Sequence, residues 1–143
     1  MNITMKYSTK LSDAIHILTY IVINQGTDLS STQIAKSVNS NPVVIRRIMS
    51  QLKNDGCLLS SNGRADPKLA RPADTISLLD IYRAVEEDTS FLKIDTKTNQ
   101  NCNVGSHIQT TLDKYYNQVQ EAAEKEMNKI KLADIIKEIQ IDN

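Results

Sequence analysis

The sequence has few of the cysteines that form disulfides in small secreted proteins, and it lacks the long apolar runs that cross membranes. It has no Trp, one Phe and only two Cys among 143 residues. Two distant cysteines do not make a disulfide scaffold, and no Cys/His spacing indicates zinc, so we expect no metal site. No apolar run approaches the roughly 20 residues that cross a bilayer, and the amino terminus lacks the pattern of a signal peptide. We therefore expect a soluble, cytoplasmic protein without a membrane partner.

The formal net charge is zero, but the charges are unevenly distributed. Residues 1–72 hold nine Lys and Arg against four Asp and Glu, a charge of +5, whereas residues 73–143 hold eight against thirteen, a charge of −5. A basic half and an acidic half are expected of a protein that presents only one face to phosphate.

Residues 31–55 are typical of a helix-turn-helix, two short helices joined by a tight turn. Asn41 is a suitable N-cap for the second helix, and Pro42 suits its first position. Apolar residues at three- and four-residue steps predict a buried stripe of Ile45, Ile48 and Leu52, with Val44 and Met49 beside it. The outward stripe consists of Val43, Arg46, Arg47, Ser50 and Lys53. This pattern suits a recognition helix in the major groove, although a plain amphipathic surface helix has it too.

A helix predicted over 7–24 precedes this motif. Side-chain donors and amide groups converge where a helix starts, so we include such residues among the contacts to double-stranded DNA. They are Tyr7, Ser8 and Lys10 here, and Ser31, Thr32 and Gln33 at the start of the helix-turn-helix. His16 has no second ligand at metal spacing, which favours a structural role over a sensor.

A β-wing is predicted after the second helix of the motif. Gly56 ends that helix, Cys57 opens an apolar run and is expected to be buried, and Asn62-Gly63 is a strong hairpin signal. Arg64 and Lys68 are then placed to reach a flanking groove or phosphate, although a solvated loop tip explains each equally well.

The pattern changes after the wing. Thr75-Ile76 is predicted to close a short strand, and Ser77 to cap a helix that packs Leu78, Ile81, Tyr82 and Val85 inward. Residues 87–106 form a polar connecting loop with a short strand over 91–94.

A long helix is predicted from His107 onward, with one apolar seam at near-heptad spacing. Such a helix needs something to pack on, most often the same helix of a second subunit, and the short helix over 132–139 could then cover the seam or the partner's domain. A monomeric helical hairpin is the alternative. The sequence thus predicts a mainly α fold with a small β-wing: a winged helix-turn-helix domain over 1–86, a connecting and sensor loop over 87–106, and dimerisation and carboxy-terminal helices over 107–143.

Four segments resemble the IscR/NsrR/CymR, or Rrf-two (Rrf2), family of bacterial winged helix-turn-helix regulators along nearly the whole chain. The segments are 6–18, 41–48, 69–72 and 76–86. The resemblance implies a homodimeric repressor of a palindromic operator. Family members that hold an iron–sulfur cluster have three cysteines in the loop before the dimer helix, whereas that loop of this chain has only Cys102, so we expect no cofactor. The family's glycine-rich wing is also replaced, by Ala65-Asp66-Pro67.

The loop around Cys102 is similar to that of a cluster-free, YwnA-like subgroup, some of whose members are thiol-based redox sensors. Cys102 precedes a helix start and lies close to His107, and both the helix dipole and a protonated imidazole would lower its pKa. A cysteine that only caps or packs the loop is the alternative.

Three functions follow from these patterns. The leading hypothesis is a DNA-binding regulator switched by Cys102, which could react with an oxidant or a small-molecule thiol. The second is a regulator controlled by a protein partner or small ligand without cysteine chemistry. The third, a thiol enzyme, lacks a resolving cysteine, a phosphate loop and a Ser/His/Asp set, so we expect no enzyme.

Overall fold

Helix α1 (Lys10–Ile23) is the element around which the amino-terminal half packs in the computed structural model, which describes residues 8–60 and 66–141. Helices α2 (Ser31–Val38) and α3 (Pro42–Asn54) pack on each other and on α1, and α4 (Leu78–Val85) packs on α1 and α3. Each contributes side chains to one core. The predicted mainly α fold with a winged helix-turn-helix is confirmed.

The ends of α2 and α3 follow from local chemistry. Asn39 ends α2 in the left-handed region at φ 60°, which Asn tolerates better than most residues. The Asn41 side chain then accepts a hydrogen bond from the Val44 backbone N–H at 3.0 Å, and Pro42 begins α3. A turn of only three residues therefore fixes the angle between the two helices.

The wing is a two-stranded antiparallel sheet of β1 (Leu58–Leu59) and β2 (Lys68–Leu69). Leu58 pairs with Leu69 and Leu59 with Lys68. The backbone N–H of Ala70 donates to the Cys57 carbonyl oxygen at 3.0 Å, and Cys57 is fully buried, as predicted. The hairpin pairing is confirmed, whereas the predicted Asn62-Gly63 turn lies outside the described residues.

Helix α1 begins at Lys10 with Thr9 as its N-cap, within the predicted range of 7–24. Other predicted elements were wrong. Thr75, predicted to be in a short strand with Ile76, is the last residue of the 3-10 helix η1 (Ala73–Thr75), whose turn is closed by a hydrogen bond from the Thr75 N–H to the Pro72 carbonyl oxygen. Ile76 is extended, and the next residue, Ser77, forms an isolated β-bridge with Lys131. Residues 91–94 have no strand. In α4, Leu79 is buried where Leu78 was expected to be, and Leu78 and Tyr82 are half-buried.

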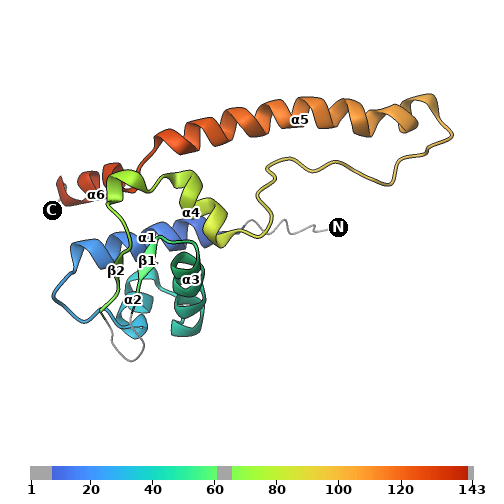
Figure 1. Ribbon diagram of the computed structural model, residues 1–143. Coiled ribbons are helices and arrows are strands. Elements are labelled where there is room, and N and C mark those ends of the chain that lie inside the picture. Colours follow the sequence, from blue (N-terminus) through green and yellow to red (C-terminus); the bar gives the residue numbers. More distant parts are fainter. Residues whose placement is uncertain (1–7, 61–65, 142–143) are drawn as a thin grey trace.

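Helix α5 (Asn103–Lys129) is a rod that projects from the rest of the molecule, with the 86–102 segment running out to its start (Figure 1). It begins at Asn103, four residues before the predicted start. Of its 27 residues, none is buried. We call α5 the arm, and the domain formed by α1 to α4, the wing and α6 the head.

Helix α6 (Leu132–Ile141) returns to the head of its own chain. It packs on α1 and η1, and Leu132 and Ile136 join the core. The Leu78 backbone N–H donates to the Ile130 carbonyl oxygen and that of Leu132 to the Ile76 carbonyl oxygen, both at 2.8 Å. These two hydrogen bonds tie the junction between α5 and α6 to the start of α4 and the residue before its cap.

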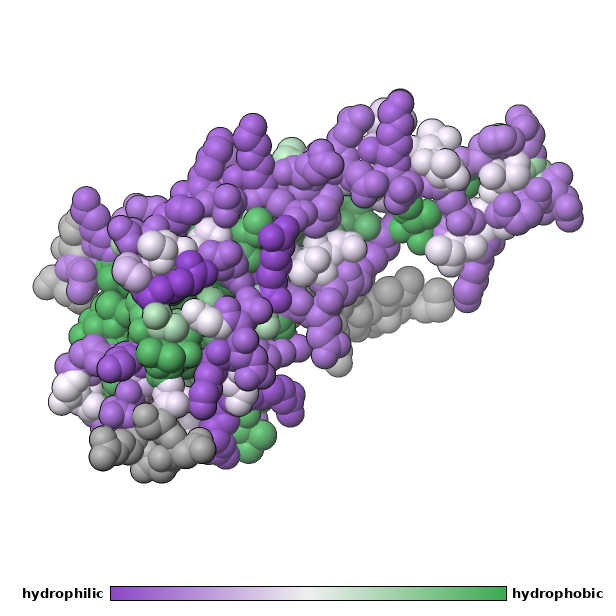
Figure 2. All heavy atoms as spheres, viewed as in Figure 1, coloured by the Kyte–Doolittle hydropathy of each residue, from purple (hydrophilic) through white to green (hydrophobic). Residues whose placement is uncertain are grey.

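The surface differs between head and arm. Hydrophobic atoms on the face drawn in Figure 2 gather on the head, and the arm is mostly hydrophilic with small apolar interruptions. Among the residues that the structure describes, no helix is both long and apolar enough to span a membrane.

Candidate nucleic-acid interface

The outward stripe of α3 is exposed as the helical periodicity predicts. Ile45, Ile48 and Leu52 face the core at 0 to 2% exposure. The opposite side chains, Val43, Arg46, Arg47, Ser50 and Lys53, are all exposed. Val43 is 56% exposed, which is unusual for a β-branched apolar side chain, and it lies one turn or less from both arginines. The stripe thus offers an apolar contact beside two guanidinium groups.

The two arginines differ in their surroundings. Arg46 Nη1 donates to Ser31 Oγ at 3.1 Å, so it lies where the start of α2 meets α3. Arg47 has no ion-pair partner in the described ranges 8–60 and 66–141. Arg46 is therefore held in place by the motif itself, and Arg47 is free to rotate toward a ligand.

The start of α2 is locally rigid. Ser30, rather than Ser31, is its N-cap and accepts the Gln33 backbone N–H at 3.3 Å, and Asp28 in turn accepts the Ser30 backbone N–H at 2.9 Å. Thr32 is exposed, and Ser31 and Gln33 are half-buried. The structure thus brings the predicted residues Ser31 and Arg46 together, whereas Gln33 takes part in the N-cap hydrogen bond through its backbone N–H.

The wing is tied to the head near its base. Gln25 Nε2 donates to the Ile21 carbonyl oxygen at 2.8 Å and to the Pro67 carbonyl oxygen at 3.2 Å. Lys68 is exposed on β2, opposite Leu59. Arg64 lies outside the described residues. The contacts at Gln25 hold the second strand beside the end of α1.

The predicted contacts at the start of α1 have mixed surroundings. Tyr7 lies outside the described residues, and Lys10 is half-buried. The Ser8 hydroxyl donates to Glu86 Oε1 at 2.6 Å, a carboxylate at the end of α4. A phosphate at Ser8 would have to compete with this carboxylate. His16 Nε2 lies 2.8 Å from Ser37 Oγ, a bond between α1 and α2.

Sequence reasoning missed two residues, Arg71 and Asp80, whose ion pair links the segment after the wing to α4. Arg71 Nη2 lies 3.1 Å from Asp80 Oδ2, and Arg71 also donates to the Thr75 carbonyl oxygen. Asp80 completes a capping box, in which it accepts the Ser77 backbone N–H and its own N–H donates to Ser77 Oγ. Burial raises the pKa of Asp80, but hydrogen bonds from Ser77 and Arg71 outweigh it, so the pKa lies below its usual value. The Ser-x-x-Asp spacing of Ser77 and Asp80 is the sequence pattern from which this capping box could have been predicted.

Cys102 is exposed and is itself the N-cap residue of α5. The backbone N–H groups of Gly105 and Val104 lower the pKa of its thiol. His107 Nδ1 instead lies 2.6 Å from the Asn103 carbonyl oxygen and 3.0 Å from Ser106 Oγ. The helix amino terminus therefore favours the thiolate as predicted, while the imidazole is bonded to the first turn of the helix.

The loop that leads to Cys102 is closed against the arm, which sequence reasoning did not detect. A Cβ atom on Gly105 would lie 2.1 Å from the Asn99 carbonyl oxygen. Thr98 Oγ1 donates to the Gly105 carbonyl oxygen at 2.7 Å, and Gln109 Nε2 donates to Thr98 Oγ1 at 2.8 Å. A glycine in an otherwise helical pattern was the signal for this close approach.

The comparisons with known proteins agree with this architecture. The family model described as Rrf2, iron-dependent transcriptional regulator, matches residues 7–138. YwnA of Bacillus subtilis (strain 168), named as a candidate HTH-type transcriptional regulator, is 40% identical over 129 residues, 90% of this chain and 96% of YwnA. A crystal structure of a candidate DNA-binding protein is 39% identical with a TM-score of 0.72, covering 89% of this chain and 98% of that one. The structure of CymR, the global cysteine regulator of B. subtilis, has a TM-score of 0.67 at 20% identity over 94% and 98% of the two chains, a likeness of fold.

Fold and relatives together define a winged helix-turn-helix protein of the transcriptional regulator class, not an enzyme. Within that class, the chain belongs to the Rrf2 family, as the resemblance predicted.

The iron named in the family description does not fit the residues of this chain. An iron–sulfur cluster requires several thiolates that converge on iron. The sequence has two cysteines, of which Cys57 is in the core and Cys102 is exposed at the start of the arm. Within 8–60 and 66–141, no group of three His, Cys, Asp or Glu side chains is placed to hold a metal ion.

Proposed function

We propose that this chain is a cytoplasmic, homodimeric repressor that binds a palindromic DNA operator through α3 and the wing. The observation that carries the proposal is the exposed stripe of α3, in which Val43, Arg46 and Arg47 lie opposite a fully buried face. Arginine donates bidentately to guanine in the major groove, and an apolar side chain contacts the thymine methyl group. Such a stripe can therefore read bases as well as phosphates.

The remaining contacts position the head on the duplex. Asn41 and Pro42 start α3, Ser50 continues the stripe, and Lys68 extends it to the wing. Contacts of this kind fix register without carrying sequence information. We assign contacts to the DNA backbone to Tyr7, Ser8, Lys10, Ser31, Thr32, Gln33, Asn41, Ser50, Arg64 and Lys68, and a van der Waals contact to Pro42, which has no N–H group to donate. The bond between Ser8 and Glu86 makes Ser8 the weakest member of this set.

Dimerisation is supported by the apolar stripe of the arm. Val104, Tyr115 and Val119 are 66%, 51% and 50% exposed, although their spacing along α5 places them on one face with Ile108 and Leu112. That face is turned away from the polar side chains that contact the chain's own head. An exposed apolar seam on a helix without a buried residue is best explained by a second copy of the same helix.

We propose Cys102 as the redox switch of this regulator. A hydroperoxide is the simplest oxidant: the thiolate attacks one peroxide oxygen, the O–O bond breaks, and the second oxygen leaves as hydroxide or alcohol after protonation. The product is a sulfenic acid, which a small-molecule thiol converts to a mixed disulfide with release of water. Either product removes the thiolate from the start of α5, beside the close approach of Gly105 to Asn99, and this change would act on the 96–102 loop.

Control by a small ligand or protein partner is the second candidate. It is favoured by the open polar cleft between the arm and the segment that leads to it. In that case, DNA release would not depend on Cys102.

Gel-shift titration of a duplex from the chain's own promoter region tests the proposal. Wild type and Cys102→Ser are compared with and without hydrogen peroxide, at several salt concentrations. We expect equal affinity of the reduced proteins, oxidant-induced release of the wild type alone, and a steep loss of affinity with salt. Equal oxidant sensitivity of both proteins would reject the thiol switch, and binding without salt dependence would reject the DNA interface.

A further inference from the structure

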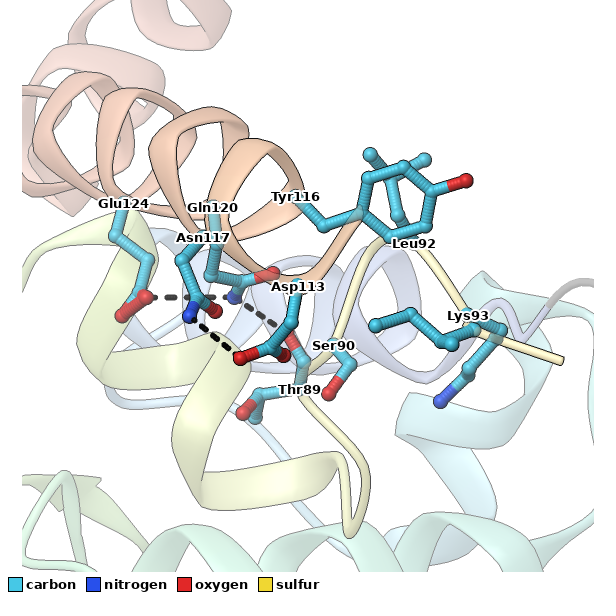
Figure 3. A pocket seen from close by; sticks show the side chains of 10 residues that line it. Thr89, Ser90, Leu92, Lys93, Asp113, Tyr116, Asn117, Gln120 and Glu124 are labelled. Atoms are coloured by element: carbon cyan, nitrogen blue, oxygen red, sulfur yellow. Dashed lines mark hydrogen bonds between the residues drawn. The ribbon is translucent and has the colours of Figure 1, made fainter. Parts of the chain in front are cut away.

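A cleft of about 420 Å³ separates the arm from the segment that leads to it. One wall is the face of α5 that carries Asp113, Tyr116 and Gln120, and the other is the chain from Thr89 to Ile94. Figure 3 shows Gln120 of α5 directed toward Thr89 of this segment, and Tyr116 beside Leu92. The volume lies in the range of small-molecule sites in proteins, about 300 to 1,000 Å³.

The cleft stays open because its α5 wall is polar. Asp113, Asn117, Gln120 and Glu124 lie at helical spacing on the face that an ordinary amphipathic helix would pack with aliphatic residues. Gln120 spans the gap at one end, since its Nε2 donates to the Thr89 carbonyl oxygen at 2.8 Å and its Oε1 accepts the Phe91 backbone N–H at 3.0 Å. Two hydrogen bonds therefore fix the width of the cleft.

The charges in the cleft are not balanced. Glu124 is paired with Arg83 at 2.6 Å, and Lys93 is paired with Asp88. Asp113 has no cationic partner within the described chain, and its one hydrogen bond comes from Asn117 Nδ2 at 3.4 Å. One carboxylate is thus left to a ligand of opposite charge.

The other lining groups suit the remainder of such a ligand. The hydroxyl oxygens of Thr89 and Ser90 can accept hydrogen bonds from an ammonium group, and Leu92 and Ile94 offer an apolar wall to a short carbon chain. The Tyr116 ring, on the same wall as Asp113, can face a cation.

We propose that this cleft binds a small organic cation, a primary ammonium carried on a short aliphatic chain, with Asp113 as its counter-ion. A ligand there would contact both the arm and the segment held by Gln120, and would therefore favour the arrangement in which these two lie together. That regulatory meaning depends on the proposed function, whereas binding itself does not.

Isothermal titration calorimetry of the full chain without DNA tests the proposal. The probes are putrescine and succinate, which each have four carbons and differ in charge, and ornithine, which is putrescine with an added carboxylate. We expect putrescine to bind with a dissociation constant below about 1 mM, as one charge-assisted contact with added hydrogen bonds allows. Ornithine binding as well would identify an amino acid as the source of the ammonium group, and succinate should not bind.

The Asp113→Asn variant is the critical comparison, because it keeps the side-chain size and removes the charge. We expect at least about a tenfold loss of putrescine affinity. Glu121→Gln is the matched control, since Glu121 is exposed on α5 and does not line the cleft, and it should bind as the wild type does. NMR shift changes should locate the ligand at Ser90, Lys93 and Tyr116. Absence of amine binding, comparable binding of succinate, or unchanged affinity of Asp113→Asn would overturn the proposal, and none of these results would affect the DNA interface.

Discussion

The head and the arm differ in how much apolar surface they bury. The head buries residues from every helix in one core, among them Ile17, Ile45 and Leu132 at 0% exposure. The arm is the longest helix of the described chain, yet it buries no residue and leaves Val104, Tyr115 and Val119 at least half exposed. Burial of apolar surface is the main stabilising term in folding, so the head can hold itself together while the arm has an unused surface.

This contrast also separates the two tasks of a regulator. The head presents a rigid reading face, because Asn41, Ser30 and the Arg46–Ser31 contact fix α2 and α3. The arm carries Cys102 and the polar cleft, where few apolar contacts oppose movement. Signals are expected where stability is low and DNA is read where it is high. The predictions below test that division.

Leu52→Ala should have the largest effect on the head. Leu52 is fully buried in α3, and removing such a side chain costs about 2 to 5 kcal/mol through lost burial and a cavity. The free energy of unfolding from urea titration measures it. Lys125→Ala, at an exposed position of the arm outside the apolar seam, is the control and should change the unfolding free energy by less than about 0.5 kcal/mol. Equal losses in both variants would remove the contrast between the two regions.

Val119→Asp should dissociate the dimer and leave the head folded. A carboxylate placed in an apolar interface costs several kcal/mol, which weakens association by at least about 100-fold. Sedimentation velocity gives the mass, and circular dichroism checks the helices. Glu121→Asp, on another face of α5, is the control and should stay dimeric. A dimeric Val119→Asp protein would place the interface elsewhere.

Arg47→Ala should weaken operator binding by about 1 to 3 kcal/mol without changing the fold, since a bidentate contact to guanine is worth that much. Fluorescence anisotropy of a labelled duplex measures it. Lys125→Ala, an exposed lysine on the arm, removes the same charge and should have a smaller effect. If the two variants lose affinity equally, only net charge matters.

Ser77→Ala should destabilise the head by about 1 kcal/mol, the usual value of an N-cap. Ser77 Oγ accepts the Asp80 backbone N–H at 3.0 Å and lies fully buried beside the junction with Lys131. Thermal unfolding compared with Ser77→Thr, which keeps the hydroxyl, separates capping from packing. Loss of the same size in Ser77→Thr would attribute the effect to volume rather than to the cap.

The smallest effect is expected from the charge of Asp80. Because the folded state lowers the pKa of this carboxyl, its charged form stabilises the head at pH above the unfolded value of about 3.9, and this contribution is lost as the pH falls through the folded value. The side chain is 37% exposed, so solvent screens the pair with Arg71. The free energies of unfolding of wild type and Asp80→Asn should differ at pH 7, and they should converge as the pH falls through the folded pKa of Asp80. A difference that persists in acid would exclude the charge as its cause.

Local chemistry made much of the fold predictable. The Asn41-Pro42 start of α3, its buried and outward stripes, and the Ser77 cap all depend on residues within one or two helical turns. The start of α5 was missed because Val104 is a single apolar residue among Asn103 to Ser106 and Gly105 disfavours a helix interior, so the regular hydrophobic pattern begins only at Ile108. For the same reason, the hydrophobic pattern did not predict that Cys102 is the N-cap residue of α5.

Contacts between distant segments were not predictable from one sequence. The return of α6 to its own head depends on pairing of Ser77 with Lys131, and the support of the wing depends on Arg71 meeting Asp80. Of the strand expected at Thr75-Ile76, Thr75 lies in a 3-10 turn and Ile76 is extended, and the pairing of this segment with the chain before α6 is limited to an isolated bridge between Ser77 and Lys131. Residue patterns specify which faces are apolar, but not which of several apolar faces will meet.

Native mass spectrometry of the wild type on a palindromic duplex selected from the chain's own promoter region is the most direct test. It counts how many chains the arm brings to one DNA molecule. The account predicts two chains per duplex at saturation, with Val119→Asp giving at most weak, single-chain complexes. One wild-type chain per palindrome, or tight binding by monomeric Val119→Asp, would contradict it.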